Sequence, residues 1–425
     1  MNKSIKPCTI ECELGSLRIT TYEIMDFQAG KRLFTVADNY FERMDPNEKI
    51  VSARFRELMD SWCCGTPSYR HVAEALNRFR LEPDGVKLTW LKDNVEKDGK
   101  QMNVMLHEQA EFVLEANGFE KDGRLMPDTV VEAAVGTETS EERAAEWIEE
   151  INNAAAKLEL KGPVKASYYE DPEITVNISA DDVLTNRQVA DRPDSKEKGQ
   201  RKYVTNTVIH VEHKGDEYLI CDPSIKGAFA LLMGFLAANG LVGMPMYVLF
   251  IDGASDLKGP IETLFAPFNY KIILDWFHLT EKLEQRLSSG MKNYKLRHIF
   301  EDEVMKPLLW YGNVAQAIES LKAIPDEDIR SQESITKLIE YLTRNEKYIP
   351  CYAMRHELGL RNSSNRVEKA NDLVVSARQK NRGMSWSYNG SRCLASVTAS
   401  WKNDELNSWC IDGNLRFSFP KSKAA

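Results

Sequence analysis

The stretch VLFIDGASDLKGPIETLF, residues 248–265, starts with apolar residues and turns abruptly polar at Asp252-Gly253. The stretch YKIILDWFHLTEKLEQ, residues 270–285, repeats this arrangement and reaches Asp275. Each apolar run is short and is followed by a helical pattern, so both predict a buried strand that leads into a helix. An aspartate at the carboxyl end of such a strand is either a turn residue or a ligand.

The segment before this stretch predicts three more strands. EITVNISADDV, residues 173–183, is a β-rich run that ends in Asp181-Asp182, and YVTNTVIHVEHKGDEYLICD, residues 203–222, alternates as two strands. An apolar helix over about 225–239 follows. The order β-β-β-α-β-α-β-α predicts an α/β fold of the RNase H-like type, a mixed sheet with flanking helices. In such a sheet the first and fourth strands are neighbours, and ligands gather at the carboxyl ends of the parallel strands.

The rest of the chain divides by pattern and composition into segments on either side of this core. Residues 288–358 are helical and interrupt the α/β pattern, and residues 119–160 are acidic and rich in alanine. We therefore expect an N-terminal strand and turn region (1–50), a mostly helical DNA-binding domain (51–118), a helical connector (119–171), the first part of the catalytic core (172–287), an all-helical insertion (288–358), and a second part of the core with a glutamate helix and a C-terminal tail (359–425).

A helix-turn-helix pattern lies in the predicted DNA-binding domain. IVSARFRELMDSWCCGTPSYRHVAEALNRFRLEP, residues 50–83, predicts two helices broken at Gly65-Thr66-Pro67, with Ser68 as the N-cap of the second. Tyr69 and Arg70 stand at the start of that helix, where a DNA reader places its contacts. A plain helical hairpin explains the same residues equally well.

The net charge and the N-terminal sequence limit the classes of protein to which the chain can belong. The chain has 425 residues, a formal net charge of −9 and a pI of about 5.5. This acidity counts against a protein that coats nucleic acid, although a local basic groove fits it. The start, MNKSIKPCTIECELGS, has no apolar signal-peptide core, so we expect a cytoplasmic protein.

One segment is long and uncharged enough to need a membrane test. Residues 227–251 contain no charged side chain until the strand ends, but Gly240, Gly243 and Pro245 interrupt the run. A spanning helix needs about 20 apolar residues in sequence. We interpret the segment as a buried helix and a buried strand, and expect no membrane association.

The eight cysteines are dispersed through a chain without export signals, which indicates reduced thiols. Cys8, Cys12, Cys63 and Cys64 have the number needed for a four-thiolate zinc site. Adjacent cysteines such as Cys63 and Cys64 rarely share one metal comfortably. A Zn²⁺ site is therefore the less favoured interpretation, and buried free thiols are the more favoured one.

Three acidic residues occupy the positions where this fold gathers ligands: Asp181 after the first strand, Asp252 after the fourth, and Glu368 in a helix that begins near Asn365. Converging carboxylates without basic partners repel one another unless a cation compensates. Hard oxygen ligands suit Mg²⁺ or Mn²⁺, and two such ions about 3.5–4 Å apart can promote in-line phosphoryl displacement.

Each of the three acids also has a purely structural explanation. Asp252-Gly253 fits a tight turn, and Asp181-Asp182 fits a loop cap. Glu368 stands three residues after Asn365 and fits the second half of a capping box. The joint pattern favours the site, because all three acids lie where one fold needs them.

Basic and aromatic residues surround Glu368. A solvated helix face is the usual explanation of such charge, and core packing is the common role of such aromatics. Beside a metal site they fit phosphate contacts and base stacking instead. The candidate DNA contacts are Arg361, Arg366, Lys369, Arg378, Lys380, Arg382 and Trp386, with Tyr69 and Arg70 in the helix-turn-helix region.

Asp275 and His278 allow two interpretations. Asp275 can N-cap the helix that it opens, with His278 in the first turn. Alternatively, both line the same sheet edge as accessory site residues and help to place the metal or the scissile phosphate.

The blocks LFIDGA, IILDWFHLTEKL and RNSSNRVEKANDLVVSARQKNRGMSW resemble those of bacterial insertion-sequence transposases of the DDE type. The resemblance covers about residues 172–410. It implies an RNase H-like catalytic core, two-metal strand cleavage and strand transfer, and recognition of terminal inverted repeats. By position it assigns catalysis and metal binding to Asp181, Asp252 and Glu368, with Asp182 as a rival for the first position. The chain departs from the family at residues 362–365, where a Gly-Ser-Gly-like turn is usual.

We therefore expect a DNA transposase that binds double-stranded DNA at the element ends and at the target, and that assembles as a homodimer or a higher synaptic complex. The insertion at 288–358 would help this assembly or place the ends. Two alternatives remain open: a DNA-binding protein of this fold that has lost catalysis, and a metal-dependent nuclease that does not join strands.

Overall fold

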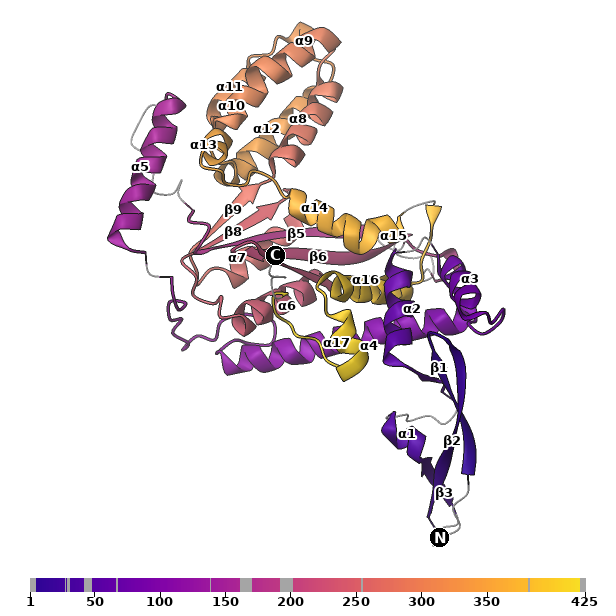
Figure 1. The fold of residues 1–425 in the computed structure, drawn as a ribbon. Coiled ribbons are helices and arrows are strands. Elements are labelled where there is room, and N and C mark those ends of the chain that lie inside the picture. The colour runs from indigo at the N-terminus through magenta and orange to yellow at the C-terminus, as the bar shows by residue number, and fades with distance from the viewer. Residues whose placement is uncertain are drawn as a thin grey trace. The chain divides into compact units, whose positions relative to one another are not determined.

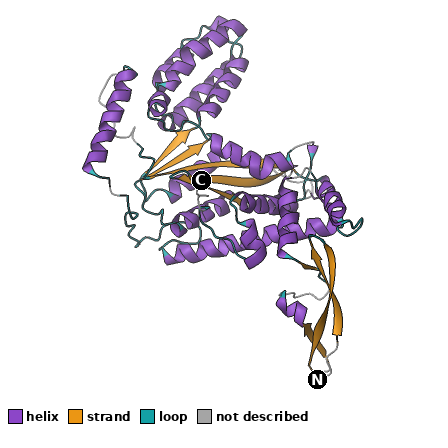
Figure 2. Cartoon of the chain, in the orientation of Figure 1, coloured by secondary structure: helices purple, strands orange, loops and turns teal. Residues whose placement is uncertain are grey.

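The chain folds into two compact units that are each built from separate stretches of sequence. The computed structural model describes residues 5–26, 28, 31–41, 48–65, 68–137, 139–160, 170–191, 202–253, 255–380 and 383–420. The first unit combines Met1–Glu108, Leu184–Asn206 and Asp372–Phe417, and the second combines Gln109–Val183, Thr207–Asn371 and Ser418–Ala425. The fold is mixed α/β (Figure 2).

A five-stranded sheet forms the centre of the second unit (Figure 1). Its order is β7-β6-β5-β8-β9, with β5 parallel to β8, β8 parallel to β9, and β6 antiparallel to β7. The neighbouring positions of the first and fourth of these strands confirm the sequence prediction. The strands are β5 (Thr175–Asn186), β6 (Tyr203–His213), β7 (Asp216–Asp222), β8 (Met246–Ile251) and β9 (Tyr270–Leu274).

The first strand is longer than the sequence predicted. We expected it to end at Asp181-Asp182, but β5 continues to Asn186. Both aspartates therefore lie within a strand and not in a loop that follows it. The loop-cap explanation of this pair is wrong, because residues 181 and 182 have extended backbone on both sides.

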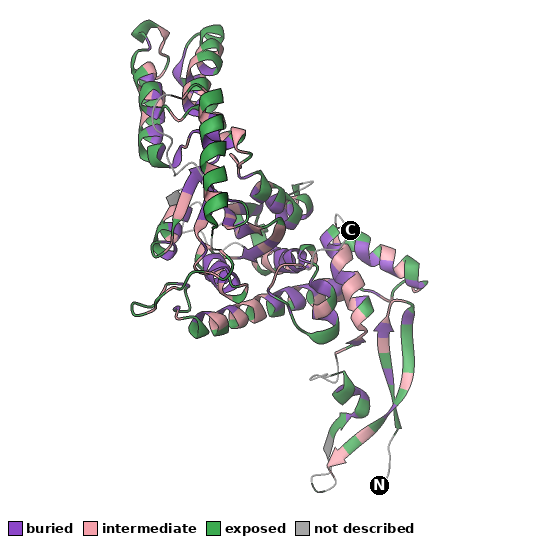
Figure 3. Cartoon of the chain, turned by 60° about the vertical axis from the view of Figure 1, so that its left-hand side comes forward, coloured by how far each residue is buried: buried purple, intermediate pink, exposed green. Residues whose placement is uncertain are grey.

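Helices connect and flank the strands of the second unit. They are α5 (Glu141–Lys157), α6 (Ile225–Ala238), α7 (Ser255–Leu264), α8 (Trp276–Gly290), α9 (Tyr294–Ile299), α10 (Lys306–Trp310), α11 (Val314–Lys322), α12 (Gln332–Asn345), α13 (Tyr352–Glu357) and α14 (Asn365–Asn371). Residues 288–358 are all described, and they contain helical segments and no strand; a π-helical segment at Phe300–Met305 joins α9 to α10. α5 is exposed along most of its length (Figure 3).

The apolar segment 227–251 folds as a buried helix and a buried strand. α6 begins at the N-cap Ser224, whose side chain accepts from the Gly227 N–H, and its middle is buried on every side. The chain then turns through Gly240 and Gly243, both with positive φ, into β8. In the part of the chain that the structure describes, no helix is both long and apolar enough to cross a membrane.

The first unit contains a small sheet and a helical core. Its sheet has the order β3-β2-β1-β4, and the core lies between helices from both ends of the chain. The elements are β1 (Ile5–Cys12), β2 (Gly15–Asp26), β3 (Lys31–Thr35), α1 (Val36–Tyr40), β4 (Ile50–Val51), α2 (Ala53–Gly65), α3 (Tyr69–Arg80), α4 (Leu88–Ala116), α15 (Ala377–Gln379), α16 (Tyr388–Lys402) and α17 (Leu406–Asp412). A π-helical segment, Asp372–Ser376, precedes α15.

The four cysteines considered for zinc do not gather in one cluster. Cys8 packs with Ala37 beside the small sheet, whereas Cys63 and Cys64 lie in the helical core. Burial raises the pKa of the Cys64 thiol to about 12, which favours a neutral thiol over a metal-binding thiolate.

Candidate active site

The sheet brings Asp181 and Asp252 together. Residues 175–179 of β5 pair with residues 246–250 of β8 in parallel register. The same register continued by two residues places Asp181 beside Asp252, and partners in register point to the same face of a sheet. The two carboxylates interact: burial, and after it the negative charge of Asp252, raises the pKa of Asp181 to about 6.

Asp275 extends this row to the next strand. Ile251 of β8 pairs with Leu274 of β9, so the residues that follow, Asp252 and Asp275, are neighbours. The Asp275 N–H donates to the Ile251 carbonyl oxygen at 2.9 Å, which continues the ladder. Aspartates therefore follow one another across three parallel strands, at the edge where β8 and β9 end, and the carboxyl ends of strands are where α/β sheets bind ligands.

Asp181, and not Asp182, is the acid that contacts the glutamate helix. The Asn371 Nδ2 at the end of α14 donates to Asp181 Oδ2 at 2.5 Å, and the Asp182 N–H donates to Asp181 Oδ1 at 2.8 Å. The Asp182 carboxylate is occupied otherwise, because it accepts from the Thr207 hydroxyl of β6 at 2.6 Å. Asn371 stands three residues after Glu368 in α14, so the two side chains lie on the same side of the helix.

Asp275 is the N-cap of α8, which confirms one of its two interpretations. Its carboxylate is completely buried and accepts from the His278 N–H at 2.8 Å. It also accepts from the N–H of Ser364, the residue before α14. Burial alone would raise the pKa of Asp275, but the hydrogen bonds from His278 and Ser364 outweigh it, and the pKa lies below its ordinary value. Asp275 thus joins the starts of two helices.

His278 lies between two carboxylates. Its Nδ1 is 3.3 Å from Asp275 Oδ1 and 3.7 Å from Glu368 Oε1. The hydrogen bond with Asp275, and then the negative charges of Asp275, Glu368 and Asp252, raise the pKa of His278 to about 9 against the opposing effect of burial. In the absence of a metal, the imidazole is therefore a cation at neutral pH, and it compensates part of the acidic charge.

The capping-box explanation of Glu368 is wrong. α14 begins at Asn365, and Ser364 precedes it; the Glu368 N–H donates to the Ser364 carbonyl oxygen at 3.2 Å, as in a regular helical turn. Glu368 is thus four residues past the cap, beyond the reach of the capping-box geometry. Its Oε1 is buried without a hydrogen-bond partner in the described structure, and burial raises its pKa.

Three side chains at the site are close enough together to hold a metal ion. Asp275, His278 and Glu368 each offer a ligand atom, and these atoms lie within 4.8 Å of one another. Of these three residues, only Glu368 was among the metal ligands predicted from the sequence. The other two predicted ligands, Asp181 and Asp252, lie next to this group: Asp181 contacts Asn371 of the glutamate helix, and Asp252 neighbours Asp275 in the sheet. The negative charge of Asp252 beside Asp181, together with the unsatisfied Glu368 oxygen, is a setting that a bound Mg²⁺ or Mn²⁺ would relieve.

A cavity of about 600 Å³ opens beside Asp252. The loop after β8, helix α8 and helix α12 of the helical insertion supply its walls. The lining residues are Asp252, Gly253, His278, Glu281, Lys282, Gln285, Tyr341 and Arg344. Lys282, Tyr341 and Arg344 were not predicted from the sequence, because a single residue in an amphipathic helix carries no local signal of the cavity that it lines.

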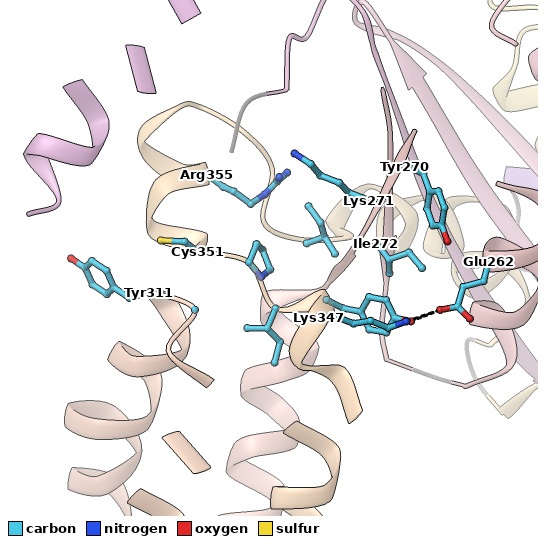
Figure 4. A pocket seen from close by; sticks show the side chains of 13 residues that line it. Glu262, Tyr270, Lys271, Ile272, Tyr311, Lys347, Cys351 and Arg355 are labelled. Carbon is cyan, nitrogen blue, oxygen red and sulfur yellow. Dashed lines mark hydrogen bonds and ion pairs between the residues drawn. The ribbon is translucent and has the colours of Figure 1, made fainter. Parts of the chain in front are cut away.

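A second cavity, of about 540 Å³, lies along the edge strand β9 and residues 347–355 (Figure 4). None of the candidate site acids lines it. Its cations have partners within the chain: Lys271 and Arg355 both pair with the buried Glu170, and Lys347 lies 3.0 Å from Glu262. These ion pairs give the charged residues of the second cavity a structural role within the chain.

Three candidate DNA contacts are core residues of the first unit, which corrects the prediction for them. Tyr69, Arg378 and Trp386 are exposed by 9%, 3% and 7%. The Arg378 Nε donates to the Cys63 carbonyl oxygen at 2.8 Å, and its guanidinium lies 4.9 Å from the Trp386 ring and 5.3 Å from the Tyr69 ring. Their polar and aromatic groups pack against one another, so they present little surface to DNA.

Two further candidates hold the glutamate helix to the sheet. Arg361 pairs with Glu212 of β6, and Arg366 pairs with Glu217 of β7 at 2.5 Å. Glu212 and Glu217 are direct partners in the antiparallel ladder, so the two arginines also separate a pair of like charges. Three of the remaining candidates are exposed: Arg70, Lys369 and Lys380. The last candidate, Arg382, lies outside the described residues.

Comparison with known proteins gives little support beyond this geometry. No family model matches the chain, and no curated protein matches it. Among solved structures, the chain is similar to the Drosophila P element transposase strand transfer complex, with a TM-score of 0.28 and 9% sequence identity over 80% of this chain and 99% of that chain. At this TM-score the similarity decides neither the fold nor the function.

Proposed function

We propose that the chain is a DNA transposase of the DDE type with an RNase H-like catalytic core. The observation that carries the proposal is the convergence of Asp181, Asp252 and Glu368: the first two by the register of parallel strands, the third through the Asn371–Asp181 hydrogen bond and the His278 ion pair. The neighbouring positions of β5 and β8, the first and fourth strands of the sheet, agree with the sequence expectation and support the proposal. The three sequence blocks that resemble insertion-sequence transposases contain Asp252, Asp275 and Glu368.

The chemistry follows from the carboxylates. Two Mg²⁺ or Mn²⁺ ions would supply the activation of the attacking oxygen and the stabilisation of the leaving oxygen. Asp181, Asp252 and Glu368 would hold the ions. Asn371 orients the Asp181 carboxylate through a neutral donor, so the acid keeps its charge for a cation. Asp275 fixes the starts of α8 and α14, and thereby the positions of His278 and Glu368.

In this proposal the substrate is double-stranded DNA at the ends of a mobile element, and the target is a second duplex. The chain would cleave a phosphodiester bond and transfer the freed 3′-hydroxyl to the target, in a homodimer or a higher synaptic assembly. The acidic net charge confines DNA contact to local basic surfaces, and the exposed Lys369 beside Glu368 is one such contact.

A cleavage and joining assay tests this proposal. DNA that carries the ends of the encoding element is incubated with the chain and Mg²⁺ or Mn²⁺, and nicked and joined products are separated. We expect the wild type to form joints and Glu368→Gln to lose at least a hundredfold in cleavage, because removal of one metal ligand removes transition-state charge stabilisation. Glu319→Gln, an exposed acid on α11, is the matched control and should keep its activity.

Other outcomes identify the alternatives. Nicks without joints would indicate a nuclease. DNA binding without nicks in either metal would indicate a DNA-binding protein that has lost catalysis. Full activity in Glu368→Gln would contradict the assignment of the third acid.

A further inference from the structure

The cavity beside Asp252 is lined by two cations that are not among the candidate metal ligands. Lys282 of α8 and Arg344 of α12 both line it. Lys258 of α7 lies close by, because its ammonium donates to the Asn345 side chain at 2.5 Å, one residue beyond Arg344. Burial, and after it the positive charge of Arg344, lowers the pKa of Lys258. Cations thus line the same cavity as the acids Asp252 and Glu281.

Arg344 is exposed at the rim of this cavity. Among the described residues, no carboxylate oxygen lies within salt-bridge distance of its guanidinium, whereas Lys337 on the same helix pairs with Glu333. The Lys282 ammonium lies 3.5 Å from the Gln285 side-chain oxygen, and no described carboxylate pairs with it. Within the described part of the chain, two cations that line one cavity thus lack a carboxylate partner, which leaves them available to an anionic ligand.

Tyr341 holds helix α12, which carries Arg344, against the turn that follows Asp252. Its side chain is buried, and a Cβ atom added to Gly253 would lie only 2.8 Å from its hydroxyl oxygen. α12 therefore packs directly against the Asp252-Gly253 turn. Arg344 stands three residues beyond Tyr341 on the same helix face, so it is held close to the carboxyl end of β8.

We propose that Lys282 and Arg344 form a phosphate subsite that binds the DNA backbone next to the scissile phosphodiester. The inference deepens the proposed function and depends on it. A DNA strand with one phosphate at the candidate metal ligands would bring a neighbouring phosphate close to Glu281, which would repel it, and the two cations in the same cavity would offset this repulsion. The guanidinium of Arg344 offers a planar donor pair that matches phosphate oxygens, and Lys282 adds a point charge.

The subsite gives the helical insertion a specific role. The site acids and Lys282 belong to the strands and helices of the sheet region, whereas Arg344 comes from the helical segment 288–358. The substrate strand would thus be held from two sides, and Arg344 would act as a positioning residue that orients the scissile phosphate.

The salt dependence of DNA binding tests the subsite without catalysis. Binding of a duplex with an element end is measured with Ca²⁺, which takes the same oxygen ligands as Mg²⁺. Each neutralised phosphate contributes about −0.9 to the slope of log K against log salt concentration on duplex DNA. We expect Arg344→Gln and Lys282→Gln each to reduce the magnitude of this slope by about 1. Lys337→Gln on the same helix should leave the slope unchanged.

A neutral phosphate analogue locates the contact. The wild type should bind DNA with one methylphosphonate next to the scissile position more weakly than it binds unmodified DNA. Arg344→Gln should bind the two DNAs equally well, because the charge that would contact this phosphate is already absent from the variant. The subsite would be overturned if Arg344→Gln and Lys282→Gln both showed the salt-dependence slope of the wild type and the same loss of affinity for methylphosphonate DNA. Weakened binding of a free mononucleotide in the variants, without any change in DNA binding, would overturn it in favour of a nucleotide pocket.

The two proposals fail in distinguishable ways. If the wild type cleaves DNA and Glu368→Gln does not, but Arg344→Gln behaves as the wild type in both binding tests, only the subsite is wrong. If the binding slope falls in Arg344→Gln but no metal-dependent cleavage occurs, the phosphate contact stands and the transposase reaction is wrong. Unchanged thermal unfolding midpoints in the exposed-residue variants exclude misfolding as the cause.

Discussion

At the scale of single residues, Gly253 shows how turn and ligand coexist at the end of β8. Its φ is +90°, a region that side-chain-bearing residues rarely adopt, and Tyr341 fills the space that a Cβ atom would need. Asp252-Gly253 is therefore a turn that glycine makes possible, and this turn also sets Asp252 beside Asp181. The two explanations that the sequence left open are compatible.

Replacement of Gly253 tests this turn. We expect Gly253→Ala to lower the free energy of unfolding by about 1–3 kcal/mol, because it adds backbone strain and a contact with the Tyr341 hydroxyl. Urea unfolding measures the change. Gly259→Ala in α7, where an added Cβ meets nothing within 4 Å, is the control and should not destabilise the protein. A Gly253→Ala variant as stable as the wild type would contradict the strained turn.

His278 makes stability depend on pH. Its folded-state pKa of about 9 lies above the ordinary value of 6.5, so its contribution is fully present below pH 6.5 and is lost as the pH rises through about 9. In metal-free buffer we expect the wild type to lose about 1–3 kcal/mol of unfolding free energy over this window. His278→Gln should lack this loss, as measured by urea unfolding at a series of pH values. A variant whose pH profile parallels that of the wild type would rule out His278 as the titrating group.

At the scale of elements, α14 is positioned from both ends. Asp275 holds its start through the Ser364 N–H, Asn371 ties its end to β5, and two arginines pair with the β6–β7 hairpin. These contacts join residues that lie between 89 and 190 positions apart in the sequence. They explain how a short helix holds Glu368 at the sheet edge.

The two arginine pairs should differ in strength. The Arg361 and Glu212 side chains are 26% and 13% exposed, whereas those of Arg366 and Glu217 are 44% and 41% exposed. We expect Arg361→Ala to cost about 1–3 kcal/mol of unfolding free energy, because it leaves a mostly buried carboxylate unpaired. Arg366→Ala should cost about 0–1 kcal/mol, as exposed pairs do. If both variants were as stable as the wild type, the structural role of Arg361 would be contradicted, and Arg361 would again be a candidate DNA contact.

The sequence predicted some of these elements well and others poorly. The apolar runs before Asp252 and Asp275 predicted β8 and β9, and the cap at Asp275 followed from its place before a helical pattern. The length of β5 was missed, because its polar residues after Asp181 gain their strand partners from β6. The start of α14 near Asn365 was predicted, but the capping-box explanation placed its cap one residue too late, because the position of Ser364 depends on Asp275, far back in the chain.

At the scale of the whole molecule, the division into two units was beyond the reach of the sequence. Periodicity is a local signal, whereas the first unit combines residues 1–108 with 184–206 and 372–417. For the same reason Arg378 and Trp386 were predicted as DNA contacts: their helical neighbours are basic, but their packing partners, Tyr69 and Cys63, stand far back in the chain.

Cleavage by two variants at adjacent positions tests the central claim, that the sheet register selects the acids of the site. Metal-dependent cleavage is measured for Asp181→Asn and Asp182→Asn, which remove one charge each at nearly constant shape. The account predicts that Asp181→Asn loses at least a hundredfold, as expected for a lost metal ligand. It predicts that Asp182→Asn, whose carboxylate accepts from Thr207, stays within about tenfold of the wild type. The reverse order, or equal activity of the two variants, would contradict it.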